Sequence, residues 1–560
     1  MRKALLRLIA GLASGLLVTS AMQIFAAAGE PYDVYNYDKY GEPIPSQSGY
    51  IAERSVTGSD LGIGNFNAPS DMYKDTRDNF WICDTGNNRI VCVNSEFNEV
   101  IGIISELKIP ESVIEKYSVD YITEQYSRTI SPPSDTATAA EKSAYNKKLQ
   151  LFREDATIVA GTIKLTNLTS PRGVYVDPYT DDIYIADNTN SRVIKCDIDG
   201  NVSQIFAVPD PTLYGTMSFW PQKVLTDKAG NLYVVVTSST SGAAMFTSEG
   251  NFIGFYGANR VQQTDEVLSN YAWSFFLTDE QMERRVKSVP SAFTNFDIDE
   301  EGFIYTCTEA KKQEMDVIKK VNPAGYNIWD NAVGNSYKFG DYSSMYVSAV
   351  AYKTQIVDID ISDNGNINCL DLTTGKVFQY DSECNLLFII GTKAKQLGGF
   401  EIVSAVESLD NNLYVLDASK LSVTIFSTTV FGEIVHEATE LYNGGYYEEA
   451  LDPWLEVLKR DGNYRRAHIG LSNAYYNKGD YELAMKYANN AMSGYLYDKA
   501  FEGYREEFIK ENLTAIVIAV LVIIVAIFTL RILIRRGIIK LPKLRLPKLK
   551  LPFKKEVKKS

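Results

Sequence analysis

The chain has 560 residues, of which 45% are apolar and 22% are charged, so most of it can form buried cores, and a wholly disordered chain is excluded. It contains only two histidines, which excludes sites that need several imidazoles, such as a three-histidine zinc site. The net charge is −14, but residues 531–560 carry +11 and residues 1–28 carry +3, which leaves −28 for the rest. So acidic a body repels phosphate backbones, and we expect no nucleic-acid partner.

The first 28 residues have the features of a secretory signal peptide. Arg2 and Lys3 precede an apolar run that ends in a series of alanines, and cleavage is expected after Ala28. No cysteine lies near this point, so a lipid anchor is not expected. An uncleaved membrane anchor is the alternative interpretation of the same segment.

Six related segments of short strands occupy the middle of the chain. Each has an apolar strand, a turn rich in Asp, Asn or Gly, and an alternating strand, and in several copies a second turn and a further strand follow. Repetition of such a unit indicates a ring of small sheets. The six copies lie at 68–90, 171–193, 221–236, 295–308, 358–371 and 403–417.

The two best copies share a strand–Asp-x-x-Asn-x-Arg–strand unit that resembles the NHL repeat of six-bladed β-propellers. The resemblance implies a mainly β, six-bladed propeller over 45–432, with the extended segment 50–56 as the fourth strand of the last blade, which closes the ring. We interpret the Asp and Arg side chains as turn-holding groups, with ligand binding as the alternative. The turn residues are Asp84, Asn87, Arg89, Asp187, Asn190 and Arg192.

Two insertions of helical composition, 105–158 and 262–287, interrupt the repeats between one blade and the next. If strands alternate in direction from centre to rim, both insertions emerge on the face that carries the Asp-x-x-Asn-x-Arg turns. The second insertion contains Tyr271, Trp273 and Phe276, and Trp273 is the best candidate for an exposed binding anchor. The alternative is that both insertions plug the ring and bury all their aromatic side chains.

Residues 433–511 contain two copies of a Gly-x-Tyr-x-x-Ala pattern, beginning at Gly445 and at Gly479. Their period of 34 resembles that of tetratricopeptide repeats. Because three or more repeats are normally needed for a groove-forming array, a stalk packed on the propeller is favoured over a peptide-binding groove.

A transmembrane helix is predicted over 512–534, because residues 513–530 contain no charge and Arg535 follows directly. The positive-inside rule then places the basic tail, 535–560, in the cytoplasm and the propeller outside the cell membrane. The tail alternates Leu-Pro with Lys or Arg, which suits contact with an anionic leaflet or a simple topology anchor.

Enzymes related to NHL propellers include metal-dependent lactonases and a zinc lyase that uses histidines. The lyase resemblance fails because both histidines of this chain, His436 and His468, lie outside the blades. Asp297, Asp299, Asp358 and Asp360 are the acidic residues that a lactonase-like metal site would need. Because turns already account for Asp299 and Asp360, and no nucleophile or phosphate motif is present, we expect no catalytic residues, no metal and no cofactor.

The preferred function is therefore that of a membrane-anchored extracellular interaction or sensing protein. It acts on another protein or an extracellular ligand, such as a component of a transport or secretion complex. A basic protein patch is the expected partner of its acidic surface, and a glycan is the other possibility, since the 36 Tyr suit either ligand. The runner-up is the metal-dependent lactonase-like hydrolase.

Overall fold

The computed structural model describes residues 32–127, 130–134, 136–162, 165–207, 214–215, 217–259, 292–308, 317–329, 339–342, 345–347, 350–352, 354–536 and 538. The chain divides into two compact units, Met1–Leu471 and Ser472–Ser560. The predicted signal peptide, the insertion 262–287 and nearly all of the basic tail lie outside the described residues.

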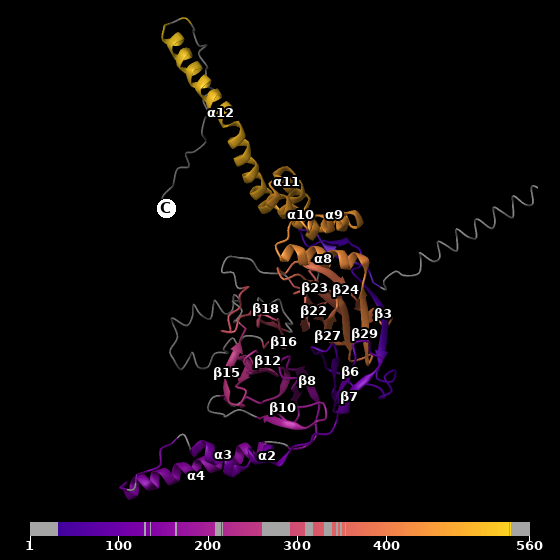
Figure 1. Ribbon diagram of the computed structural model, residues 1–560, viewed down its shortest axis with the longest axis vertical. Helices are drawn as coiled ribbons and strands as arrows, with labels where there is room; N and C mark the ends of the chain where they lie inside the picture. Colours follow the sequence, from indigo (N-terminus) through magenta and orange to yellow (C-terminus); the bar gives the residue numbers. More distant parts are fainter. Residues whose placement is uncertain are drawn as a thin grey trace, which may run out of the picture. The chain divides into compact units, whose positions relative to one another are not determined.

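The first unit contains six small antiparallel sheets whose inner strands follow one another around a ring (Figure 1). Blade 1 comprises β4 (Asp71–Lys74), β5 (Phe80–Asp84), β6 (Arg89–Val93) and β7 (Val100–Ile104). Blade 2 comprises β8 (Pro171–Val176), β9 (Ile183–Asp187), β10 (Arg192–Cys196) and β11 (Val202–Phe206). Blade 3 comprises β12 (Pro221–Thr226), β13 (Leu232–Val236), β14 (Gly242–Phe246) and β15 (Phe252–Gly257).

Blade 4 has three described strands, β16 (Asn295–Ile298), β17 (Ile304–Cys307) and β18 (Ile318–Val321). Blade 5 comprises β21 (Ile356–Ile361), β22 (Ile367–Asp371), β23 (Lys376–Tyr380) and β24 (Leu386–Ile390). Blade 6 comprises β27 (Val403–Leu409), β28 (Asn412–Asp417), β29 (Ser422–Thr428) and β3 (Tyr50–Thr57). Short pairs lie outside the blades: β1 (Tyr35–Tyr37) with β2 (Pro43–Pro45), β19 (Met345–Val347) with β20 (Val350–Tyr352), and β25 (Thr392–Lys393) with β26 (Gly399–Phe400). The prediction of a six-bladed propeller is thus confirmed.

The core of the propeller lies between neighbouring blades. Every residue of β5, β9 and β13 is buried, because both faces of these second strands are covered by adjacent sheets. One apolar cluster joins blades 1 and 2, and another joins blade 6 to blade 1. The ring closes where β3 pairs antiparallel with β29, with Val56 opposite Val423. The predicted closure by residues 50–56 is therefore confirmed, because a segment from the start of the propeller completes its last blade.

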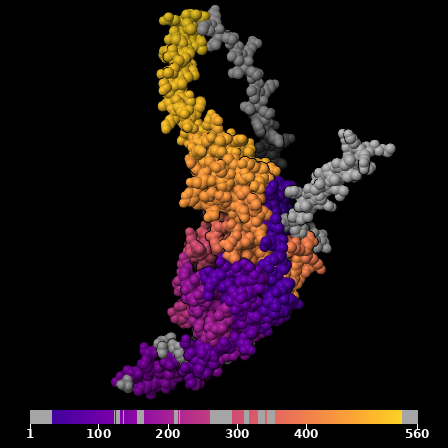
Figure 2. Space-filling model, turned by 45° about the vertical axis from the view of Figure 1, so that its right-hand side comes forward, coloured from indigo at the N-terminus to yellow at the C-terminus, as the bar shows by residue number. Residues whose placement is uncertain are grey.

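Between β7 and β8 the first insertion forms α2 (Glu111–Glu115), α3 (Val119–Ser127) and α4 (Ala139–Thr162). The helices α3 and α4 lie against each other and extend away from the blades (Figure 2). In contrast, α2 packs on the outer strand β11, and the Tyr117 hydroxyl donates to the carbonyl of Ile205. The insertion therefore starts along the outer strand of blade 2.

After the ring, α8 (Val430–Asn443), α9 (Leu451–Arg460) and the start of α10 (Arg465–Lys478) complete the first unit. The second unit contains the rest of α10, α11 (Tyr481–Asn490) and α12 (Gly494–Arg535). Gly445 and Gly479 both have φ +82°, one before α9 and the other before α11, so the two sequence copies form the same left-handed turn. Helices are thus confirmed over this region, and membership of the tetratricopeptide family remains a prediction.

The helix α12 is the one helix in the described part of the chain that is long and apolar enough to cross a membrane. It has 42 residues, and none of the side chains in its most apolar window is buried. It is a candidate membrane span that includes the segment predicted from the sequence.

Candidate functional site

Polar and charged side chains gather where the six inner strands meet at the ring axis. The strand registers place the inner-strand residues of the six blades in two layers. Residues of one layer occupy equivalent positions, because each pairs with the corresponding residue on the second strand of its own blade. The first layer is Asp71, Gly173, Lys223, Asn295, Asp358 and Ala405. The second layer is Tyr73, Tyr175, Leu225, Asp297, Asp360 and Glu407.

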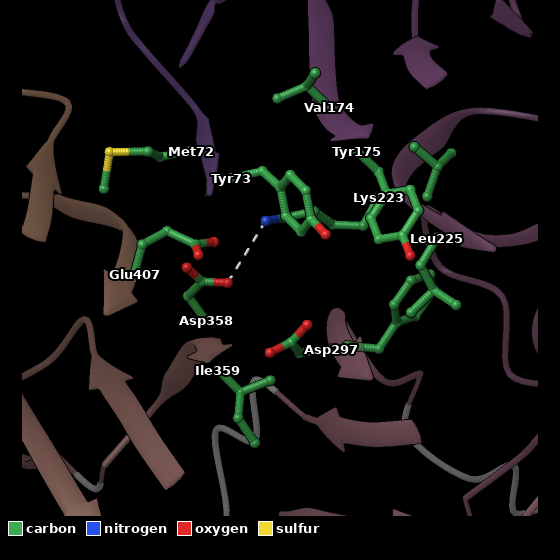
Figure 3. A pocket seen from close by; sticks show the side chains of 12 residues that line it. Met72, Tyr73, Val174, Tyr175, Lys223, Leu225, Asp297, Asp358, Ile359 and Glu407 are labelled. Atoms are coloured by element: carbon green, nitrogen blue, oxygen red, sulfur yellow. Dashed lines mark ion pairs between the residues drawn. The ribbon is translucent and has the colours of Figure 1, made fainter. Parts of the chain in front are cut away.

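The ammonium group of Lys223 crosses the axis and joins three alternate blades. It forms an ion pair with Asp71 of blade 1, and its Nζ lies 3.5 Å from Oδ1 of Asp358 in blade 5 (Figure 3). All three side chains are buried or nearly so, and Asn295 also donates to Asp358. Because the cation is supplied by the chain itself, it compensates two carboxylates that would otherwise be buried without a partner.

The carboxylates also fasten neighbouring inner strands to one another. Oδ2 of Asp71 accepts from the amide of Val174 at 2.9 Å, which links blade 1 to blade 2. Oδ2 of Asp358 accepts from the amide of Val406 at 2.7 Å, which links blade 5 to blade 6. Two further links have the same form: Asp297 accepts from Ile361 N at 2.7 Å, and Glu407 accepts from Lys74 N at 3.3 Å.

We define the axial cluster as Asp71, Lys223, Asp297, Asp358, Asp360 and Glu407. Its carboxyl groups hold their protons more tightly than free carboxyls do. Burial raises the pKa of Asp71 to about 6 and that of Asp360 to about 6. Burial, followed by the charges of Asp360 and Asp297, raises the pKa of Glu407 well above its ordinary value. The pKa of Lys223 is also raised, because the nearby carboxylates outweigh the opposing effect of its burial, so it stays charged.

The space that remains at the axis is small. The cavity beside the cluster has a free volume of about 20 Å³, which is room for one water molecule. Its walls combine the charged groups with apolar side chains such as Met72, Phe296 and Ile359, and the rings of Tyr73 and Tyr175 lie 4.8 Å apart at its edge (Figure 3). In this arrangement the cluster binds neighbouring blades together around a small cavity.

A metal ion does not fit these residues. In the described part of the chain no three His, Cys, Asp or Glu side chains are arranged to hold one. At the axis, Asp71 and Asp358 are already engaged by Lys223, and Asp297 and Asp358 by backbone amides. Asp299 lies apart from the cluster, where it accepts from the amide of Phe303 at 2.8 Å and pairs with Lys320 at 3.0 Å.

The Asp-x-x-Asn-x-Arg turns hold the links that enter each blade. In blade 2, Arg192 Nε donates to Asp187 Oδ2 at 2.7 Å, and Asn190 donates to the same oxygen at 2.9 Å. The other oxygen of Asp187 accepts from the amide of Thr169, and Arg192 also donates to the carbonyl of Thr166, so the return of the first insertion is fixed here.

Blade 1 repeats this arrangement: Asp84 accepts from Arg89 at 2.7 Å, from Asn87 at 2.8 Å, and from the amide of Asn67 at 2.7 Å. Asp371 and Asp417 keep half of it in blades 5 and 6, since each accepts from the amide of an incoming link. These contacts give the turn residues an architectural role, and no ligand is required to explain them.

A buried chain of polar groups runs outward from the axis through blade 5. Asn368 donates to Asp360 at 2.7 Å, and Gln379 donates to Asn368 at 2.9 Å and to the hydroxyl of Tyr50 at 2.8 Å. Nε2 of His436 in α8 lies 2.8 Å from the side-chain amide oxygen Oε1 of Gln379, and burial lowers the pKa of His436 to about 4, so the ring is neutral. This row of polar side chains connects α8 to the interior of the ring through hydrogen bonds alone.

The candidate site residues predicted from the sequence have two different outcomes. Asp297, Asp358 and Asp360 come together at the axis, whereas Tyr271, Trp273 and Phe276 lie outside the described residues. Sequence reasoning missed Lys223 and Glu407, whose only signal is a charged residue within an inner strand.

Some solved structures are similar to this chain at low sequence identity and low TM-score. No protein-family model and no curated protein matches the sequence. Virginiamycin B lyase from Staphylococcus aureus is 9% identical, with 67% of this chain and 99% of that chain covered and a TM-score of 0.34. Kuenenia stuttgartiensis hydrazine synthase is 10% identical over 68% of this chain and 99% of that chain, also at 0.34. A protein of unknown function from Bacteroides thetaiotaomicron is 9% identical over 67% and 72% respectively, at 0.35.

Proposed function

We propose that this chain is a membrane-anchored extracellular interaction module, whose propeller presents a helical hairpin to a protein partner. The observation that carries the proposal is the exposure of α4. None of its described side chains is buried, although it is 24 residues long and contains Leu151, which is 51% exposed. A helix whose described side chains are not buried contributes little packing to the propeller through these residues, which are therefore suited to contact another molecule.

Contacts between α3 and α4 join the two helices into one hairpin. Arg153 of α4 pairs with Asp120 of α3 at 3.1 Å, and α2 seats the hairpin on the rim of blade 2. At its other end the insertion returns to the turn of Asp187 and Arg192. A long insertion held at both ends by a rigid scaffold is the usual arrangement of a binding loop.

The anchoring part of the proposal rests on α12 and on the ends of the chain. The predicted signal peptide exports the propeller, α12 crosses the bilayer, and the basic residues that begin at Arg531 remain in the cytoplasm. Because the exported body is strongly acidic, a basic surface on the partner is favoured over a neutral one. A membrane protein of a transport or secretion complex that has a basic extracellular surface would lie in the same membrane and would match the acidic charge of the propeller.

The test replaces one exposed side chain on the hairpin. Leu151→Asp in the full-length chain should abolish capture of the partner from native membranes, as detected by cross-linking and mass spectrometry. Ile253→Asp is the matched control, because Ile253 is 49% exposed on the outer strand of blade 3, away from the hairpin. Equal capture by the two variants would refute a role for the hairpin.

The predicted anchor Trp273 is tested in the same way. Trp273→Ala should weaken capture and leave the thermal midpoint unchanged. Tyr179→Ala is its control, because Tyr179 is 63% exposed in the turn between β8 and β9, which is at the opposite end of the strands from the Asp187 turn.

The metal-dependent lactonase is the weaker candidate. The free volume at the axis does not hold a lactone ring, and Lys223 provides the positive charge that a lactonase would take from its metal. A lactone turnover that requires a divalent ion and is lost in Asp358→Ala would reverse this order.

A further inference from the structure

The helix α12 continues well beyond the length that a bilayer requires. Its 42 residues span about 63 Å, whereas a bilayer core needs about 20 residues. With the apolar segment starting at Leu513, the first 19 residues of α12, from Gly494 to Asn512, stand outside the hydrocarbon core. Their side chains therefore face water or another protein, except near the headgroups.

Four aromatic side chains form a stripe along this outer part of α12. Tyr497, Phe501, Tyr504 and Phe508 follow one another at spacings of four, three and four residues, which places them on one face of a helix. The rings of Tyr497 and Phe501 lie 6.5 Å apart at an interplanar angle of 5°, and those of Tyr504 and Phe508 lie 6.4 Å apart at 23°.

Most of this aromatic stripe is exposed. Tyr497 is 41% exposed, Phe501 is 45% exposed and Phe508 is 50% exposed. At 1.5 Å per residue, Phe501 stands about 18 Å above the start of the apolar segment, beyond the headgroup region. Lipid therefore accounts for the exposure of Phe508 but does not account for that of Phe501 and Tyr497.

The neighbouring helix of the same unit covers a different side of α12. Leu496 and Ala500 are buried there, and a Cβ on Gly503 would lie 2.4 Å from the ring of Tyr481 in α11. At 100° per residue this covered side lies next to the aromatic stripe and does not include it. The packing of α11 thus holds α12 in place with its aromatic face outward.

The same face continues through the apolar segment. Ala515, Ala519, Val522 and Ala526 lie within about 60° of Tyr497 around the helix axis and follow one another at spacings of four, three and four. Small residues let two membrane helices approach closely. One straight face thus extends from the aqueous end of α12 into the membrane.

From this arrangement we propose that a second copy of this chain covers the aromatic face of α12, so that two copies form a parallel, in-register helix pair. Insertion into one membrane gives both copies the same direction and the same depth, so each stripe meets its own equivalent. The flanks also suit self-pairing: Glu507 lies on one side of the stripe and Arg505 on the other, and a twofold axis brings each towards the other in the partner. From Tyr497 to Ala526 this face is about 44 Å long, and with a width of about 10 Å it covers roughly 900 Å² over the two helices, which is close to the lower size of a specific interface.

Disulfide cross-linking of the full-length chain in membranes tests this pairing. Phe501→Cys should give a covalent dimer on oxidation, and Glu506→Cys, on the opposite side of α12, should give at least roughly tenfold less. The unaltered chain provides the background, because five of its six cysteines are buried and all lie before α8. Two differently tagged copies expressed together show whether both halves of the dimer are this chain.

A mixed pair tests the register. A Phe501→Cys copy combined with a Phe508→Cys copy should form less dimer than either variant with itself, because the two positions are about 10 Å apart along the axis. Preferential mixed pairing would overturn the in-register arrangement. Cross-linking of Phe501→Cys to a different protein, to its own propeller, or to nothing would overturn the proposal of a second copy.

The proposal depends on the membrane span that it shares with the proposed function and on no other part of that function. Phe501→Glu should shift the detergent-solubilised chain from dimer to monomer, and the capture of a partner by the α3–α4 hairpin should continue. Loss of capture with an intact dimer, as in Leu151→Asp, would concern the proposed function alone.

Discussion

Arg466 of α10 forms a buried ion pair with Asp381, the residue that follows β23, with 2.7 Å between Nη2 and Oδ2. The two side chains are 2% and 0% exposed, and the guanidinium also stacks over the rings of Tyr442 at 4.5 Å and Trp454 at 5.9 Å. A helix that follows the propeller in sequence is thus fastened to blade 5 by one charge.

Removal of one partner of this pair should destabilise the helical segment strongly. Arg466→Met leaves the carboxylate of Asp381 buried without its cation, at a cost of about 3–5 kcal/mol. Lys459→Met is the control, because its pair with Glu456 on the surface of α9 is exposed. Chemical denaturation followed by tryptophan fluorescence provides the measurement, since Trp454 reports on this region. A shift no larger than that of the control would show that the pair is not a fastening point.

Lys223 should matter to the whole ring, since it joins blades 1, 3 and 5. Lys223→Met keeps the volume of the side chain and leaves Asp71 and Asp358 uncompensated, so we expect a loss of about 3–5 kcal/mol at neutral pH. Because both carboxyls can take up protons, the loss should shrink at pH 5. The double variant Lys223→Met with Asp71→Asn should recover part of the stability, and a double variant less stable than the single one would contradict this account.

The axial carboxyls predict a stability that falls as pH rises. Burial raises the pKa of Glu407 well above its ordinary value in the folded protein, so as the pH rises past about 4.5 the folded state keeps a proton that the unfolded state has released. The free energy of unfolding therefore decreases with rising pH until the pH reaches the raised pKa of Glu407. Glu407→Gln mimics the protonated side chain and should remove about 1 kcal/mol per pH unit from this slope.

Two buried histidines have the opposite effect on the pH dependence of stability. The Glu407→Gln variant separates their contribution from that of Glu407. Burial lowers the pKa of His436 to about 4 and also lowers that of His468, so their effect on stability is lost as pH falls below about 6.5. Because both remain in Glu407→Gln, the difference between the two pH profiles reports on Glu407. Parallel profiles from pH 5 to 7.5 would show that Glu407 is ionised in the folded state.

The two intact Asp–Arg turns differ in burial and should differ in energetic importance. The side chain of Arg192 is 1% exposed and that of Arg89 is 15% exposed, while their ion-pair distances are both 2.7 Å. Arg192→Ala should therefore cost about 3–4 kcal/mol, and Arg89→Ala about half as much, because water reaches the remaining carboxylate more easily in blade 1. Equal losses would show that burial of the arginine does not set the cost.

The sequence predicted the parts of this fold that local patterns carry. The turn that holds Asp84 and Arg89 has a fixed spacing, and the extended strand 50–56 was the natural partner for a last blade that lacked one. In contrast, Lys223 could not be assigned to the axis. A lysine in an alternating strand normally faces solvent, and only the register of all six blades brings it between Asp71 and Asp358.

The helices outside the blades were also only partly predictable. The helical composition of 105–158 indicated helices in this insertion, at the positions of α2 and α4, but nothing local predicted α3 or showed that α2 packs on the outer strand of blade 2. Likewise, residues 433–511 were interpreted from the sequence only as a stalk. The aromatic stripe of α12 could be interpreted as a contact face only once the structure showed that α12 is one continuous helix and that α11 covers the adjacent side.

The attachment of α8 to the ring gives the last prediction. Gly432 lies in the first turn of α8, where the Cβ of an alanine would be 2.3 Å from the carbonyl oxygen of Gly49 and 2.6 Å from Cγ2 of Thr428. Glycine in a helix is otherwise unfavourable relative to alanine, so the close approach of the strand that leads into β3 explains its presence. Gly432→Ala should push α8 away from this strand and cost about 1–3 kcal/mol, although alanine favours the helix itself. Gly494→Ala, at a helix start with nothing within 4 Å, is the matched control and should be neutral or slightly stabilising. A Gly432→Ala variant as stable as the control would mean that α8 is not held against the strand that closes the ring.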